Sequence, residues 1–214
     1  MRNQAISFDE TDFKYQGERD GVHLWFTPMG DGLGLYSYLI PPDIGADLHD
    51  VVGLRAFYRR IADDAGLGVI EIEQVIVGEC KVVRTLFKMA QEPAGRTYLG
   101  SLTFPFRDCS YVLKVQCPEH GVKGLRDTVV SMNLMQAGKI GFDPDTGAVA
   151  GWLDDPYDPN ERGPMTRNQS ERPEFDAQFP EHPLSRARLV LDHLQRTVQV
   201  EETVRKQPKY QWHG

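Results

Sequence analysis

Residues 68–117 determine the fold expected of this chain, and they read GVIEIEQVIVGECKVVRTLFKMAQEPAGRTYLGSLTFPFRDCSYVLKVQC. The stretch predicts strands at residues 68–77, 80–91, 96–104 and 109–117, because it is rich in β-branched and aromatic residues and its apolar residues often alternate with polar ones. The links between these segments are two to four residues long. Links this short require consecutive strands to pair antiparallel. We therefore expect a four-stranded antiparallel meander.

A hairpin is expected before the meander. Residues 22–27 alternate between apolar and polar side chains, and residues 33–40 form a second strand segment after the glycine-rich turn at 28–32. Pro41 and Pro42 end this segment, because proline cannot continue the ladder of a central strand. The hairpin brings the predicted antiparallel sheet to about six strands.

Two helices should cover this sheet. Between residues 50 and 65 the apolar spacing becomes helical, and Gly66 follows as a C-terminal cap. Residues 125–137 carry a second stripe at helical spacing and end before Gly138; the stripe consists of Leu125, Val129, Met132 and Met135 or Gln136. We expect the helices to pack on one face of the sheet, which makes the fold class an α+β sandwich.

The remainder of the chain differs in composition. Residues 139–179 are rich in Asp, Pro, Gly and Asn, which predicts a long irregular strap, and residues 183–200 predict a C-terminal helix. The expected organisation is a polar N-terminal arm (1–20), an α+β sandwich domain (21–138), the strap and C-terminal helix packed on the same domain (139–204), and a tail (205–214).

Composition limits the classes of function and location. The formal net charge is −7 and no basic cluster is present, which argues against nucleic acid, because phosphate binding requires grouped Lys and Arg side chains. No apolar stretch approaches the roughly 18 residues of a membrane helix, and the first residues lack the apolar run of a secretory signal. With three cysteines, an odd number, we expect free thiols and a cytoplasmic location.

Few residues have the spacing of a catalytic or metal site. Cys117 and His120 have the spacing of half a zinc site, and a thiolate with an imidazole is a nucleophile pair in principle, but no second ligand pair is present. Glu71 and Glu73 lie on one face of a predicted strand, about 6.6 Å apart by strand rise, which some glycosidase carboxylates also show. Exposed charges on an edge strand explain them more simply. We therefore assign no catalytic residue and expect no metal or cofactor.

Two sets of residues remain as candidates for binding. The first set would contact a protein partner and consists of Trp152, Tyr157, Arg186 and Arg188, although the aromatic residues would serve equally well as internal anchors of the strap. We expect the two arginines, with Arg196, on a solvated face of the last helix. The second set would form a pocket beneath the strap and consists of His23, Glu71, Glu73, Cys117 and His120.

Two sequence blocks carry a resemblance. The first includes Tyr98-Leu99-Gly100-Ser101-Leu102, the segment from Ser110 to Cys117, and Gly121-x-x-Gly124-x-Arg126-Asp127. The second includes Trp152-x-x-Asp155-Pro156-Tyr157-Asp158-Pro159, Arg167-Asn168, and Phe179-Pro180-x-His182-Pro183-Leu184-Ser185-Arg186. Together they resemble a family of uncharacterised bacterial proteins, which implies kinship and no particular activity. The predicted order of elements also resembles the PsbP-like α/β sandwich, whose members mostly act as binding or accessory proteins.

Three hypotheses on function follow. The first is a non-catalytic binding or accessory protein, such as an adaptor, chaperone or immunity-type partner in a bacterial secretion or toxin system, because no complete catalytic constellation is visible. The second is a small hydrolase or ligand-binding enzyme whose site forms under residues 139–180. The third is a structural oligomer subunit, which would carry an additional apolar patch on the helix at residues 183–200.

Overall fold

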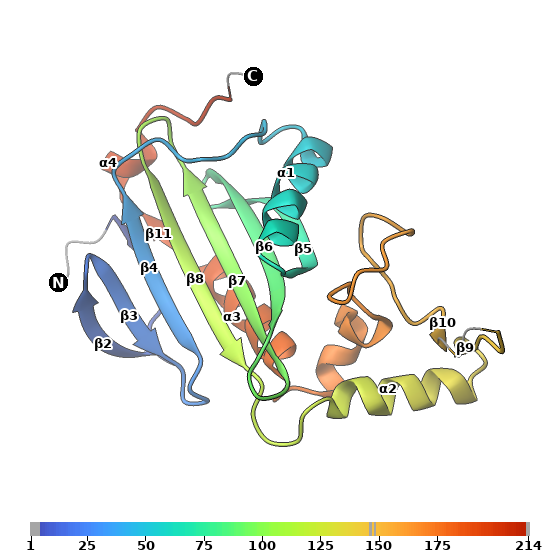
Figure 1. Ribbon diagram of the computed structural model, residues 1–214. Helices are drawn as coiled ribbons and strands as arrows, with labels where there is room; N and C mark the ends of the chain where they lie inside the picture. Colours follow the sequence, from blue (N-terminus) through green and yellow to red (C-terminus); the bar gives the residue numbers. More distant parts are fainter. Residues whose placement is uncertain (1–4, 146, 148, 213–214) are drawn as a thin grey trace.

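The computed structural model describes all residues except 1–4, 146, 148 and 213–214, and its core is a seven-stranded antiparallel sheet (Figure 1). The strand order is β2-β3-β4-β8-β7-β6-β5, formed by β2 (Lys14–Arg19), β3 (Val22–Phe26), β4 (Gly32–Tyr38), β5 (Gly68–Val77), β6 (Cys80–Ala90), β7 (Arg96–Pro105) and β8 (Ser110–Pro118). The predicted meander is β5 to β8, and β4 joins the hairpin to it by pairing with β8. The antiparallel α+β class is confirmed, with one strand more than the six expected.

A helix covers each face of the sheet. α3 (Pro183–Thr197) packs on β7 and β8, and α1 (Val51–Asp64) packs on β5 from the other side. The two helices expected to share one face were those at residues 50–65 and 125–137, and of these only the first, α1, packs on the sheet. The opposite face is covered by the C-terminal helix α3, and β6 gives the physical reason. Its neighbouring residues Val82 and Val83 point to opposite faces of the sheet, and both are fully buried. Val82 belongs to the core that contains Leu191 of α3, whereas Val83 belongs to the core that contains Leu54 of α1. Both faces of the sheet are apolar here and both require cover.

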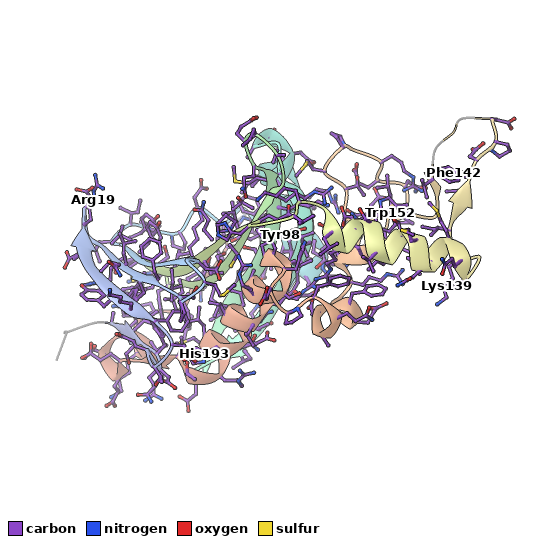
Figure 2. All side chains as sticks on the ribbon, turned by 90° about the horizontal axis from the view of Figure 1, so that it is seen from below. Arg19, Tyr98, Lys139, Phe142, Trp152 and His193 are labelled. Atoms are coloured by element: carbon purple, nitrogen blue, oxygen red, sulfur yellow. The ribbon has the colours of Figure 1, made fainter. Side chains whose placement is uncertain are left out.

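α2 (Leu125–Gln136) does not pack on the sheet. Figure 2 shows it extending away from the sheet, with Lys139 beyond its outer end and Tyr98 on the side of the sheet. Its buried residues are Arg126, Val130 and Leu134. The predicted apolar stripe therefore does not face the sheet, because α2 is turned so that Arg126 points inward to buried acceptors.

The irregular segment after α2 packs against that helix and against the edge of the sheet. It contains the short strands β9 (Gly141–Phe142) and β10 (Val149–Ala150) and the 3-10 helices η1 (Gln169–Glu171) and η2 (Pro173–Gln178). Its partly buried aromatic residues Trp152, Phe175 and Phe179 pack on the buried face of α2. The segment is thus the irregular strap that the sequence predicts, held by aromatic anchors.

The described residues near each end of the chain, from residue 5 and up to residue 212, contribute to the fold. The expected polar arm supplies β2 at one edge of the sheet and β1 (Ile6–Ser7), which pairs with β11 (Gln199–Val200). Ile6 and Phe8 are buried in the core on the α3 side, and Phe13 and Tyr15 pack against the same core. These apolar contacts account for the ordering of a segment that is polar in composition. After α4 (Glu202–Arg205), the expected tail remains in contact, since Tyr210 packs against the core on the α1 side.

Two further expectations concern unpaired cysteine thiols and the absence of a membrane-spanning helix. Cys80, Cys109 and Cys117 are free and buried, in agreement with the expected unpaired thiols. Within the described part of the chain, no helix has the length and apolar character needed to cross a membrane.

Candidate binding site

A hollow of about 400 Å³ opens at the N-terminal end of α2, between the loop after β8 and the segment before α3. Typical ligand pockets enclose about 300–1,000 Å³. Its apolar lining consists of Val122, Leu125, Phe179, Pro180 and Pro183. Val122 is 73% exposed and Leu125 is 51% exposed. The hollow therefore presents apolar side chains that are in contact with water.

The loop on one side of the hollow is fixed by Glu119, whose side chain is buried. Its carboxylate accepts hydrogen bonds from the backbone N–H groups of Arg96 (3.0 Å) and Gly124 (2.8 Å). Gly124 has a φ of 69° at the start of α2, in the left-handed region that glycine adopts without strain. This loop is therefore pre-formed, and it holds the exposed His120 at the rim.

Arg126 joins the two sides of the hollow from behind. Its fully buried guanidinium donates to the backbone oxygens of Ser170 (2.7 Å) and Arg172 (3.0 Å). It also donates to the carboxylate of Asp176 (2.9 Å) and the hydroxyl of Ser185 (2.8 Å). Since a guanidinium presents its five donors in a rigid fork, this one side chain fixes α2, the strap and the first turn of α3 relative to one another.

Asp127 forms a second connection between α2, the sheet and the strap. It accepts hydrogen bonds from Arg96 on β7 (2.5 Å) and from the hydroxyl of Ser170 on η1 (2.5 Å). Burial acts to raise the pKa of Asp127, but the charge of Arg96 and the two hydrogen bonds outweigh it, and the net pKa is below the ordinary value. The carboxylate is therefore ionised at neutral pH, in the first turn of α2 where negative charge is favourable.

His182 lines the hollow from the other side. It is the N-cap of α3, and its Nδ1 accepts the backbone N–H of Leu184 at 3.2 Å. Burial, together with the charge of Arg126, lowers the pKa of His182 from 6.5 to about 3. The ring is therefore neutral at physiological pH. With Nδ1 acting as acceptor, its proton lies on Nε2, which can donate a hydrogen bond.

A buried ion pair fixes the strap to the sheet next to this site. Nζ of Lys88 on β6 lies 2.5 Å from the carboxylate of Glu171 on η1, and both side chains are at most 1% exposed. Lys88 also donates to the backbone oxygen of Thr166 (3.0 Å). Glu171 also accepts from the hydroxyl of Tyr98 (2.7 Å) and the backbone N–H of Asn168 (2.9 Å). Each charge therefore has more than one partner, which offsets its removal from water.

Of the three arginines expected on a solvated face of the last helix, Arg196 is exposed, but Arg186 and Arg188 are buried, so the expectation is wrong for these two. Arg186 forms a two-point ion pair with the buried carboxylate of Asp31 (2.8 and 2.9 Å). Arg188 pairs with Asp176 (3.0 Å) and donates to the backbone oxygen of Glu171 (2.7 Å). Both guanidinium groups are buried because internal carboxylates compensate them, and neither is presented to a partner.

Trp152 and Tyr157 are internal anchors of the strap. Trp152 packs on α2. The hydroxyl of Tyr157 accepts the backbone N–H of Ile72 on β5 (2.7 Å) and lies 3.0 Å from the carboxylate of Glu73, to which it donates. Burial raises the pKa of Tyr157 to about 12, so the phenol remains protonated. Of the two roles considered for these residues, the structure gives them the internal one.

The five candidate residues for a pocket under the strap do not come together. His23 is on β3 whereas Glu71 and Glu73 are on β5, five strand positions away in the sheet, which is roughly 24 Å at the usual strand spacing. Cooperation in acid–base chemistry requires hydrogen-bond distances. Cys117 is fully buried, and burial raises the pKa of its thiol. Only His120 lines the hollow described above.

The carboxylates and histidine of that set have local partners instead. Glu71 pairs with Arg84 (2.6 Å), Glu73 with Arg55 (2.6 Å), and His23 lies 3.0 Å from the hydroxyl of Tyr15.

A smaller hollow of about 240 Å³ does lie between the strap and α1, beside the ion pair of Arg59 and Asp155 (2.6 Å). Among the described residues, no group of three or more metal-ligating side chains is placed to hold a metal ion.

Sequence reasoning missed the buried charges that shape the candidate site. The sequence of β6 did contain a signal for one of them. Every second residue of this strand, Val82, Arg84, Leu86 and Lys88, points to the same buried face. A lysine at such a position indicates a buried ion pair. The sequence does not reveal that its partner is Glu171, which is supplied by an irregular segment 83 residues later. The two quoted blocks do contain both sides of the hollow, but only the structure brings them together.

Comparisons with known proteins give little further information. No family model and no curated protein matches the chain. One crystal structure, of a protein from Bacteroides thetaiotaomicron VPI-5482, is similar over 55% of this chain with 10% sequence identity and a TM-score of 0.35. The chain covers 40% of that protein. A likeness this distant carries no argument on fold or function.

Proposed function

We propose that this chain is a non-catalytic binding protein that receives an apolar part of a partner protein in the hollow at the N-terminal end of α2. The observation that carries the proposal is the exposure of Val122 and Leu125 in a hollow whose two sides are fixed by the buried Arg126. Binding would remove this apolar area from water. A pre-formed site also loses little conformational entropy on binding, which favours affinity.

The rim of the hollow indicates which partner chemistry is favoured. Glu181 is exposed at the rim, and the whole chain carries a net charge of −7. Complementary charge steers association and selects partners. An apolar anchor flanked by basic side chains would therefore suit this site, with Nε2 of His182 as a hydrogen-bond donor within it.

The charged groups around the hollow support a binding role. Glu119, Arg126 and Asp127 are all engaged in bonds that fix the walls. They thus act as a scaffold for the apolar lining. An adaptor, chaperone or immunity-type protein would use such a surface. We propose that the protein acts in one of these roles in a bacterial secretion or toxin system.

Affinity purification from native cells tests this function. The tagged wild type should retain a stoichiometric partner at low and high salt, and Val122→Glu should reduce the amount at least about tenfold, since a charge at the centre of an apolar contact commonly costs more than 1 kcal/mol. Val52→Glu is a matched control, because Val52 is 72% exposed on α1, far from the hollow. A wild type that purifies alone, or a partner that both variants retain equally, would contradict the proposal.

A further inference from the structure

A separate hollow of about 420 Å³ lies on α3, between the N-terminal arm and the turn that joins β3 to β4. This arm hollow shares no lining residue with the hollow at the N-terminal end of α2. Its apolar lining consists of Phe13, Pro28, Met29, Leu189 and Val190. Met29 is 48% exposed and Leu189 is 65% exposed. The arm hollow therefore has the size of a small-ligand pocket and an apolar lining that water can reach.

The turn on one side of the arm hollow is fixed by Asp31, which is buried. The backbone oxygen of Asp31 accepts the backbone N–H of Thr27 (2.9 Å), and its own backbone N–H donates to the hydroxyl of Thr27 (3.1 Å). Its carboxylate forms the buried ion pair with Arg186 of α3. This pair attaches the turn to α3, and its two charges compensate each other.

His193, labelled on α3 in Figure 2, fixes the arm on the other side. Its Nε2 donates a hydrogen bond to the backbone oxygen of Asp9 (2.7 Å), and its ring lies 5.5 Å from the ring of Phe13, centroid to centroid. Phe13 in turn packs edge to face against the buried Phe8. Since both walls are attached to α3, the arm hollow is pre-formed, which favours affinity for a small ligand.

Two further charged side chains line the arm hollow, Asp12 on the arm and Arg196 on α3, and both are exposed. Among the residues that the structure describes, neither of them has an ion-pair or hydrogen-bond partner. They do not pair with each other, so the two groups lie farther apart than an ion pair allows. The lining thus offers one free carboxylate and one free guanidinium next to an apolar surface.

We propose that the arm hollow binds a small zwitterion with an apolar body, namely an α-amino acid with a large apolar side chain. Its carboxylate pairs with the guanidinium of Arg196, a group that can bind a carboxylate through two parallel hydrogen bonds. Its ammonium group pairs with the carboxylate of Asp12, and its side chain lies against the apolar lining. A ligand with a single charge leaves one of the two rim groups unpaired, and an uncharged ligand leaves both.

The volume of the arm hollow sets the size of the ligand. An apolar cavity of about 150 Å³ holds a benzene molecule, so a hollow of about 420 Å³ has room for an aromatic ring together with the charged groups of an amino acid. For so small a ligand we expect a dissociation constant between about 10 µM and 1 mM. The inference goes beyond the proposed function, because both the hollow and the ligand differ from those of the partner protein.

Isothermal titration calorimetry of the full chain with three compounds tests the charge requirement. The probes are L-phenylalanine, N-acetyl-L-phenylalanine, which lacks the ammonium group, and L-phenylalanine amide, which lacks the carboxylate. L-Phenylalanine should bind about three- to fivefold more tightly than either analogue, since each analogue forfeits one exposed ion pair. No binding of L-phenylalanine at millimolar concentration, or equal affinity for the three compounds, overturns the inference.

Two charge variants assign the contacts. Arg196→Gln should abolish the preference for L-phenylalanine over its amide, because the carboxylate has lost its partner, and should keep the preference over the N-acetyl compound. Asp12→Asn should have the opposite pattern. Lys114→Gln and Glu18→Gln are matched controls, since both residues are exposed on strands and neither lines the arm hollow. Controls that change either preference as much as the test variants overturn the assignment.

A third variant tests the apolar contact. Leu189→Ser keeps both charged groups and removes apolar area from the lining, so it should weaken binding of all three compounds about fivefold and leave the charge preferences intact. Unchanged affinity would contradict a site on this face of α3. Circular dichroism melting checks that each variant is folded, which is expected because Asp12, Leu189 and Arg196 are exposed.

Failure of this inference is distinguishable from failure of the proposed function, because Asp12 and Arg196 do not line the hollow at α2. Arg196→Gln should therefore still retain the partner protein in affinity purification, and Val122→Glu should bind L-phenylalanine as the wild type does. Loss of L-phenylalanine binding in Val122→Glu would overturn the assignment of the ligand to the arm hollow.

Discussion

At the scale of single residues, this protein uses buried charges to fix irregular backbone. Arg126, Lys88 and Glu171 are at most 1% exposed, and each bonds to a segment distant in sequence. Desolvating such groups is costly, and breaking one partner of a buried pair is more damaging than replacing both. These side chains fix the position of the strap, because an irregular segment has few backbone–backbone hydrogen bonds of its own to hold it in place.

Lys88→Met should destabilise the protein by about 3–5 kcal/mol, since it leaves the carboxylate of Glu171 buried without its cation. Adding Glu171→Gln should recover a large part of this loss, because a neutral amide needs no cation. Its oxygen can still accept from the backbone N–H of Asn168, and its NH2 group can donate to the hydroxyl of Tyr98. Urea unfolding of the wild type, both single variants and the double variant measures the coupling. The exposed pair of Glu202 and Lys206 gives a control, as Lys206→Met should leave the midpoint nearly unchanged. Additive single effects would contradict the account.

His182 should make stability depend on pH. Its pKa is about 3 in the folded protein and 6.5 as the ordinary value, so between these values the unfolded chain binds more protons and stability falls as pH is lowered. His182→Asn removes this titration and keeps a side-chain acceptor at the N-cap. The thermal midpoint of wild type should therefore fall more between pH 7 and about pH 4 than that of the variant. Equal falls would show that His182 is not buried in its neutral form.

At the scale of elements, the strap completes the edge of the sheet. β5 is an edge strand, and an unpaired edge invites association with other strands. Tyr157 covers it by accepting the backbone N–H of Ile72, while the side chain of Arg55 donates to the backbone oxygen of the same residue. Side chains thus take the place of a neighbouring strand.

Tyr157→Phe should cost about 1–2 kcal/mol, because the N–H of Ile72 loses its partner. Hydrogen exchange resolved at the amide of Ile72 should become faster in the variant than in the wild type. Tyr38→Phe is a suitable control, since Tyr38 is 45% exposed at the end of β4. Unchanged protection of the Ile72 amide would mean that the strap does not seal this edge.

The sequence predicted local elements better than their placement. The meander was correct because alternation and two-to-four-residue links are local signals. α2 was also expected, but its orientation was not, because the apolar stripe of Leu125, Val129 and Met132 suggested burial while the inward position belongs to Arg126. The partners that reverse this preference, Asp176 and Ser185, are about 50 to 60 residues away. Such long-range polar contacts have no periodic signature.

At the scale of the whole molecule, two apolar cores enclose the sheet while α2 and the strap form a separate cluster beside it. The hollow lies where this cluster meets the sheet and α3, so its shape depends on all three.

The central claim, that the hollow receives a partner protein, is tested most directly by photo-crosslinking in the native cells. A photoreactive amino acid is placed at position 122, in the hollow, or at position 52, equally exposed on α1. We predict an adduct with one defined partner protein from position 122 and none from position 52. Adducts of equal yield and identity from both positions, or no adduct with another protein from position 122, would contradict the claim.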